Sequence, residues 1–162
     1  MSMKRMVSAL MIWGFATIPI LSQTLVEPNQ KFVWETFSFV FPEPVVVKIE
    51  STASKKLTVY PAKRDGFFMV VRTLPWNEPM VEKVLWKESV FTRGIEPKET
   101  QKTVGNLSFQ VFQADQIRNQ NALHNQVWIG LETKPALWIW LQWKKDRKDL
   151  TEFFESNLFL SL

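Results

Sequence analysis

The residue types that most enzymes use for catalysis are scarce in this chain. His124 is the single histidine, and there is no cysteine. These counts exclude a thiol nucleophile, a zinc–thiolate site and any site that needs two histidines. A Ser-His-Asp set can be written from Ser108, His124 and Asp115, but no nucleophile-elbow motif or glycine-rich oxyanion loop accompanies it. The sequence therefore predicts no catalytic residue, no metal site and no enzyme.

Phosphate, cofactor and nucleic-acid binding find equally little support. The chain has five glycines, too few and too scattered for a phosphate loop or a dinucleotide fingerprint, so no cofactor is expected. Lys4 and Arg5 account for two of the 20 basic residues, which leaves 18 bases against 16 acids in the rest of the chain. These bases are scattered among acids and form no dense basic stripe, which argues against nucleic acid as a partner.

Aromatic residues are the one type in excess, with eight tryptophans and thirteen phenylalanines. Most of them alternate as core residues do, but Trp34 and Trp76 are harder to place inside. Tryptophan and arginine are enriched at protein-binding hot spots. We therefore predict a binding cleft bounded by Trp76, Arg72 and the polar stretch 114–125, which contains His124. The alternative is that these tryptophans simply close the ends of a sheet.

Most of the chain shows the pattern of β-strands. Phe37, Phe39 and Phe41 alternate with Ser38 and Val40, which is the period-two pattern of a strand with one buried face. Stretches rich in β-branched and aromatic residues, bounded by Pro and Gly turns, predict further strands. These stretches are 45–49, 57–60, 67–74, 107–112, 126–133 and 136–143, whereas 114–125 is expected to be a loop.

Two segments show helical spacing instead. Asn77, Glu78 and Pro79 suit a first helical turn, and an apolar stripe continues from Met80 to Phe91. The second segment runs from Asp146 to Phe159, with Asp146 or Asp149 placed to cap its start. Strand 137–143 is apolar on both faces, so it should lie centrally in a sheet covered on both sides. Helices on each face would provide that cover.

Four segments follow one another in a characteristic order: Phe37-Ser38-Phe39-Val40-Phe41-Pro42, Gly105-Asn106-Leu107-Ser108-Phe109, the strand from Ala136 to Trp143 and the segment from Phe153 to Phe159. In this order and pattern the chain resembles the Mog1/PsbP-like domain. The resemblance extends over residues 35–162 and implies an α+β fold in which an antiparallel sheet is sandwiched between helices. It also implies a family of mostly non-catalytic assembly factors and partner-binding modules, without a shared catalytic set to transfer.

The first residues have the layout of an export signal. Lys4 and Arg5 precede an apolar run from Met6 to Leu21, and the first acid is Glu27. The run is shorter than the roughly 20 residues that span a bilayer comfortably. We expect residues 1–24 to be an export signal or an uncleaved anchor, residues 25–34 a polar spacer, and residues 35–162 one domain. A buried apolar helix is the alternative for the run.

Together these patterns predict an exported, non-enzymatic module that binds or stabilises another protein at or near a membrane. The expected location is the periplasm of a bacterium, either free or anchored through residues 6–21. The alternative is a periplasmic protein that binds a small molecule or a lipid, which would need an apolar pocket.

Overall fold

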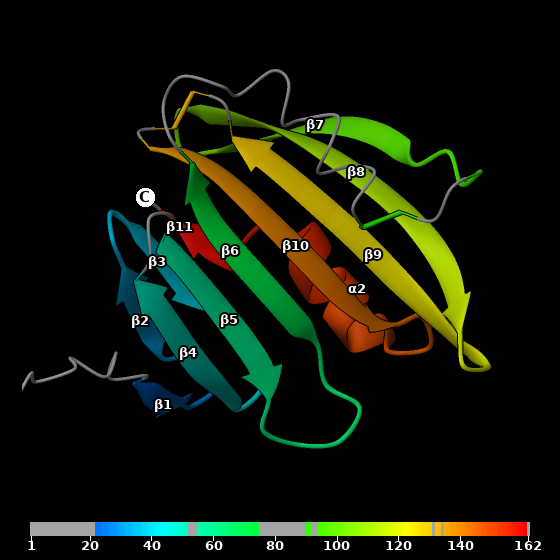
Figure 1. The fold of residues 1–162 in the computed structure, drawn as a ribbon, viewed down its shortest axis with the longest axis horizontal. Helices are drawn as coiled ribbons and strands as arrows, with labels where there is room; N and C mark the ends of the chain where they lie inside the picture. The colour runs from blue at the N-terminus through cyan, green and yellow to red at the C-terminus, as the bar shows by residue number, and fades with distance from the viewer. Residues whose placement is uncertain are drawn as a thin grey trace, which may run out of the picture.

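The computed structural model describes residues 22–51, 55–74, 90–91, 94–130, 132–133 and 135–161. Most of the predicted leader, most of the first predicted helix and Trp76 lie outside these ranges. Gln23 and Thr24, expected at the end of the leader, belong to the strand β1 (Gln23–Val26). The described chain folds as a large curved sheet with a small sheet and one short helix packed against it (Figure 1).

The large sheet has eight strands, and every neighbouring pair is antiparallel. Its central pair joins the two halves of the chain, because Val70 of β6 lies opposite Trp140 of β10. In spatial order the strands are β1 (Gln23–Val26), β4 (Val45–Ser51), β5 (Lys55–Pro61), β6 (Phe68–Leu74), β10 (Ala136–Lys144), β9 (Asn121–Gly130), β8 (Leu107–Arg118) and β7 (Lys98–Val104).

The small sheet and the helix cover one face of the large sheet, which we call the inner face. The small sheet contains β2 (Lys31–Trp34), β3 (Phe37–Val40) and β11 (Leu160–Ser161), and the helix is α2 (Lys148–Glu155). Phe154 of α2 packs on Trp143 with ring centroids 5.0 Å apart, and Phe159 packs edge-on against Trp128 at 5.1 Å. The main hydrophobic core therefore lies between the two layers.

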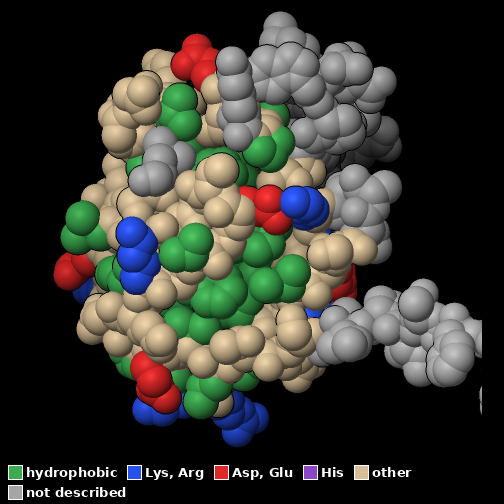
Figure 2. Space-filling model, turned by 90° about the vertical axis from the view of Figure 1, so that its left-hand side faces the viewer, with side chains coloured by type: hydrophobic (Ala, Val, Ile, Leu, Met, Phe, Trp, Pro, Cys, Tyr) green, Lys and Arg blue, Asp and Glu red, His purple; other side chains and the backbone are tan. Residues whose placement is uncertain are grey.

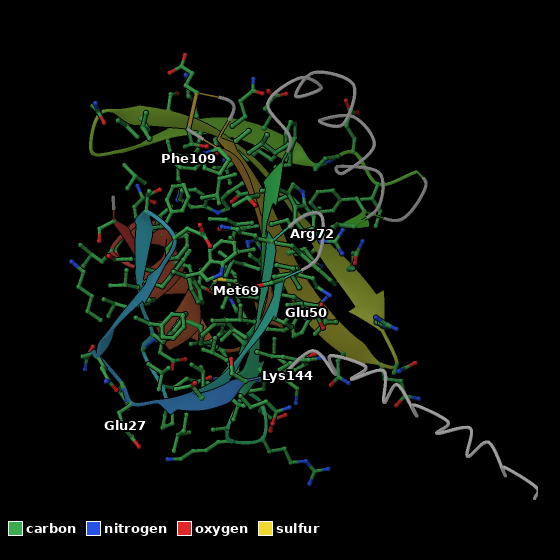
Figure 3. All side chains as sticks on the ribbon, turned by 60° about the vertical axis from the view of Figure 1, so that its left-hand side comes forward. Glu27, Glu50, Met69, Arg72, Phe109 and Lys144 are labelled. Carbon is green, nitrogen blue, oxygen red and sulfur yellow. The ribbon has the colours of Figure 1, made fainter. Side chains whose placement is uncertain are left out.

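The opposite, outer face carries a second and smaller group of apolar residues. Val70, Phe112, Val127, Ile129 and Trp138 form this group together with Phe91. In Figure 3 the large sheet is seen nearly edge-on, with Met69 and Phe109 on the inner side and Arg72 and Glu50 on the outer side.

The expected α+β fold, with its sheet sandwiched between helices, is wrong. The described chain is mostly β, and the inner face is covered mainly by a second sheet. The expectation that strand 137–143 is covered on both faces is correct. Leu137 and Ile139 are fully buried on the inner face, and Trp138 is 5% exposed on the outer face. A strand that is apolar on both faces needs cover on both, but a sheet can provide that cover as well as a helix can.

Several expected strands are confirmed. The polar stretch 114–125 was expected to be a loop, and this expectation is wrong. The stretch forms the ends of β8 and β9, joined by a turn at Asn119 and Gln120 with positive φ values of 49° and 65°. Two consecutive residues in the left-handed region are the mark of a two-residue hairpin turn. The polar side chains of this stretch predict a loop, but they lie on a hairpin.

The predicted terminal helix is shorter than expected. It begins at Lys148 after Arg147, which provides no side-chain cap, so neither Asp146 nor Asp149 acts as the expected cap. It ends before Asn157, whose φ of 62° stops the helix. The chain then enters β11, where Leu160 lies opposite Phe39.

Residues 25–34, expected to be a spacer, contain the end of β1, a turn and all of β2. Val26 and Trp34 are 2% and 4% exposed, so this segment contributes to the core.

Figure 2 shows the face of the molecule that lies on the left in Figure 1. Hydrophobic side chains gather in the middle of this face, and charged side chains lie around them.

Candidate binding groove on the outer face

An aromatic groove lies on the outer face, across the two central strands. Its volume is about 360 Å³. The floor comes from β6 and β10, and Lys56 and Arg72 stand at its rim. The lining residues are Lys56, Phe68, Val70, Arg72, Val90, Trp138 and Trp140.

The groove follows directly from strand alternation. Side chains two residues apart on a strand share a face, so Phe68, Val70 and Arg72 project together from β6. The register then places Val70 opposite Trp140 and Arg72 opposite Trp138. Four apolar side chains and one cation are thereby brought onto one surface.

Ring contacts give the groove its shape. Phe68 packs edge-on against Trp140, with ring centroids 5.4 Å apart, and Tyr60 of β5 packs on Phe68 at 5.5 Å. The Arg72 guanidinium carbon lies 5.5 Å from the centre of the Trp138 ring. Tyr60 is 42% exposed, and Phe68 and Trp140 are half-buried. Aromatic surface therefore remains accessible to solvent.

A buried polar network fixes the orientation of Trp140. The Asn125 side chain is fully buried, and its Oδ1 accepts hydrogen bonds from Trp140 Nε1 at 3.1 Å and from Gln142 Nε2 at 2.9 Å. Asn125 Nδ2 donates to Gln116 Oε1 at 3.2 Å, and Gln116 Nε2 donates to the carbonyl oxygen of Val90. A satisfied network of this kind holds the indole rigidly in place.

The rim of the groove is positively charged. Glu50 is bound by two lysines, Lys48 at 2.8 Å and Lys56 at 3.2 Å. The hydrogen bond from Lys48 and then that from Lys56 lower the pKa of Glu50. Within the described part of the chain, no carboxylate forms an ion pair with Arg72. Three bases and one acid at this end of the outer face leave a net positive charge.

A second, polar pocket lies beside α2, on the other side of the sheet. His124 Nδ1 and Asp115 Oδ1 are 2.6 Å apart, and Lys145 Nζ is 2.6 Å from Asp115 Oδ2. Burial raises the pKa of Asp115, but the hydrogen bonds from Lys145 and His124 outweigh this effect and lower it. The pocket is lined by Asp115, His124, Lys145, Lys148, Thr151 and Glu152.

This second pocket does not contain the complete Ser108-His124-Asp115 set. The His124–Asp115 pair forms as the sequence allowed, but Ser108 lies seven residues away along β8 and accepts a hydrogen bond from Gln101. His124 Nε2 is buried and finds no hydrogen-bond partner among the described residues. Thr151, the hydroxyl in the pocket, is bound to the indole of Trp143 and the carbonyl of Arg147. In the described ranges no group of acids and histidines could hold a metal ion.

The structure separates the residues expected to form one cleft. Arg72 shares the outer face with Trp138, whereas His124 packs on Trp143 of the inner face, with ring centroids 4.9 Å apart. Trp76 lies outside the described residues. Arg72 is thus in the groove and His124 is not.

Sequence reasoning missed Trp140 and Phe68 as groove residues, and Tyr60 as the exposed ring beside them. The available signal was the strand 137–143, whose two faces are both apolar. It showed that Trp138 and Trp140 share a face, but not that this face stays partly open.

Comparison with known proteins gave no match: no family model, no curated protein and no solved structure is significantly similar to this chain. The resemblance to the Mog1/PsbP-like domain therefore stays a prediction. Among the residues that the structure describes, no helix is long and apolar enough to cross a membrane.

Proposed function

We propose that this protein is an exported, non-enzymatic binding module that holds another protein in its outer-face groove, at or near a membrane. One observation carries the proposal. Aromatic surface on Tyr60, Phe68 and Trp140 remains accessible on the outer face, while the inner-face aromatics Trp128 and Trp143 are at most 1% exposed.

The chemistry of the groove suits a protein partner. Tryptophan, tyrosine and arginine dominate the binding energy of protein interfaces, because they provide large contact area with a polar handle. The groove contains tryptophan and arginine, and Tyr60 lies beside it against Phe68. The Asn125 hydrogen bonds hold Trp140 in advance of binding, which lowers the entropy lost when a partner docks.

The export part of the proposal rests on the sequence. Lys4 and Arg5 followed by the apolar run from Met6 to Leu21 favour passage across a membrane. The absence of cysteine agrees with a protein that folds outside the cytoplasm without disulfides. Intact-mass measurement of the protein isolated from its native envelope tests this part, since loss of about the first 22 residues would show cleavage of a signal.

Photo-crosslinking tests the binding part. A photoreactive residue at position 60, beside the groove, is expected to crosslink to one protein in the native envelope. A matched residue at position 117 is the control, because Ile117 is 84% exposed but lies far along β8 at the tip of a hairpin. The groove proposal requires the position-60 adduct to disappear with Phe68→Ala. Equal adducts from both positions, or none from position 60, would contradict it.

A small-molecule or lipid ligand is the second candidate. Its support is the groove volume of about 360 Å³ with a largely apolar lining, which is within the range of small-ligand sites. Native mass spectrometry of the purified protein distinguishes the two. A retained small molecule that is lost in Phe68→Ala would favour this candidate over the protein partner.

A further inference from the structure

We propose that the segment bound in the groove carries a carboxylate two residues from a large apolar side chain, and that Arg72 binds this carboxylate. This inference rests on the proposed function, since it specifies the chemistry of the partner at the same groove. It follows from the charge of Arg72, from its position over the Trp138 ring and from the spacing of the groove along β6.

Arg72 is a cation whose charge the described residues leave uncompensated. Its side chain is exposed, and its guanidinium rests over the face of Trp138 at 5.5 Å. Glu50 belongs to the same row across the sheet, since it lies opposite Lys56, and Lys56 lies opposite Arg72. Both carboxylate oxygens of Glu50 are already bound to lysines, at 2.8 Å and 3.2 Å.

The cation–π contact with Trp138 is compatible with carboxylate binding by Arg72. A guanidinium that lies over an aromatic ring can still present N–H groups to a ligand, and these match the two oxygens of a carboxylate. Trp138 is 5% exposed and cannot move aside easily. The Trp138 ring therefore gives the guanidinium a fixed neighbour at this end of the groove, where an incoming carboxylate can reach it.

The sheet fixes the distance between the charged and apolar parts of the groove. Arg72 and Val70 are two residues apart on β6, which corresponds to about 7 Å along a strand. Val70 lies beside Trp140 and forms the apolar floor with Phe68. An extended partner also presents side chains to one face every two residues. An apolar residue at position i therefore pairs best with Asp or Glu at i+2 or i−2.

The rest of the rim strengthens this preference. Lys48 and Lys56 leave one net positive charge after Glu50 is counted, and Arg72 adds another. A basic segment would be repelled, and an acidic one attracted over roughly the Debye length of 8 Å at physiological salt. Charge complementarity thus favours an acidic protein segment over a neutral or basic one.

Selection from a displayed library of random 12-residue peptides tests the inference and does not require the natural partner. The purified protein, Arg72→Gln and Lys63→Gln are used as parallel targets. Lys63→Gln is the matched control, because it removes one exposed positive charge from the turn between β5 and β6. The wild type and Lys63→Gln should both enrich an acid two positions from an aromatic or large aliphatic residue, and Arg72→Gln should not.

Synthetic peptides then measure the effect. Replacing the selected Asp by Asn, or moving it one position closer, should weaken binding to the wild type about tenfold, the size of one charge-assisted contact. The same changes should have no effect on binding to Arg72→Gln, and added salt should reduce the difference.

The outcomes separate the two proposals. Peptides that bind in the groove with equal affinity for Asp and Asn would overturn this inference and leave the protein-binding function standing. A library in which nothing binds through Phe68 would overturn both. Binding of phosphatidylglycerol vesicles in place of peptides, lost in Arg72→Gln, would assign the cation to a lipid headgroup and overturn the inference.

Discussion

The inner and outer faces of the eight-stranded sheet are built from the same kinds of residue, yet they differ in what covers them. On the inner face, Trp128 and Trp143 are 0% and 1% exposed beneath the small sheet and α2. On the outer face, Trp140 and Phe68 are half-buried and Arg72 is exposed. Both faces follow the same alternation along β6 and β10.

The difference teaches that an apolar strand face becomes core only when another part of the chain packs on it. Phe154 and Phe159 return to the inner face from the end of the chain and contact its aromatic rings at 5.0 to 5.1 Å. Burial of such rings supplies most of the stabilisation. Groove residues with accessible surface contribute less to folding, which leaves them available for binding.

The largest expected loss comes from removing a ring of the inner face. Phe154 is fully buried and contacts four other rings, so Phe154→Ala should lower the free energy of unfolding by about 3–5 kcal/mol. Denaturant titration measures the loss. Phe153→Ala is the control on the same helix, because Phe153 is half-buried and should cost clearly less. Equal losses of unfolding free energy in Phe154→Ala and Phe153→Ala would contradict the distinction between buried and partly exposed positions.

Overpacking the inner face should come next. A Cβ added at Gly130 would lie 2.6 Å from Phe109 Cε1 and 2.9 Å from Thr133 Cγ2. Gly130→Ala should therefore destabilise the fold by about 1–3 kcal/mol, as inserted methyl groups do in packed cores. A second change, Phe109→Leu, removes the ring atoms that clash. The double variant should recover part of the loss, and additive losses would mean that the clash is not the cause.

An ionic cluster at the margin of the inner face should have a smaller effect. Arg147 donates to Asp149 at 2.9 Å and 2.7 Å, to Glu43 at 3.1 Å and to the Asp65 carbonyl at 2.7 Å. The hydrogen bonds with Asp149, and then those with Glu43, raise the pKa of Arg147 despite partial burial. A lysine ammonium cannot donate the paired hydrogen bonds that the Arg147 guanidinium makes to Asp149. Arg147→Lys should therefore lower the free energy of unfolding, measured by a thermal melt, by about 1 kcal/mol. Arg64→Lys, at an exposed position, should have almost no effect.

The outer face should show the opposite behaviour to the core. Arg72→Gln loses one exposed contact with Trp138, so its unfolding free energy should fall by less than about 1 kcal/mol. Its binding to an acidic partner should nevertheless weaken about tenfold. Calorimetry on the same samples measures both quantities. A large loss of stability with unchanged binding would make Arg72 a structural residue and would remove the contrast between the faces.

The smallest expected effect is a pH dependence at the polar pocket beside α2. Lys145 and His124 lower the pKa of Asp115 in the folded state, so its contribution to stability is present above the ordinary pKa of about 4. That contribution is lost as the pH falls through the lowered value. The melting temperature of Asp115→Asn should lie below that of the wild type at pH 7, and the two should converge once the pH falls below the lowered pKa of Asp115. A difference that stays constant with pH would mean that packing, not charge, is responsible.

The sequence predicted the strands of this fold better than it predicted which elements pack on the faces of the sheet. The alternation in 137–143 correctly indicated a central strand, and the Phe37-Phe39-Phe41 pattern correctly indicated a buried strand face. These inferences succeed because alternation is a local property of an extended chain. The prediction of a loop over 114–125 was wrong because side-chain amides such as those of Asn125 and Gln116 form hydrogen bonds with one another across a hairpin. Such cross-strand pairing cannot be read from a linear sequence pattern.

The candidate site shows the same limit. Arg72 was singled out from its residue type, but its expected partner His124 lies across the sheet, and Trp140 was not chosen at all. Grouping residues into one site requires the register between strands. That register depends on contacts between residues about seventy positions apart, such as Val70 and Trp140.

The sequence by itself determined that the described chain is rich in strands, that its central strand needs cover on both faces, and that catalytic residues are scarce. These properties depend on residue type and on the period of two along a strand. Only the tertiary structure decided that a second sheet covers the inner face and that an aromatic groove beside Arg72 stays open on the outer one. The physical reason is that cover comes from chain segments distant in sequence, and local alternation gives both faces of a strand the same signal.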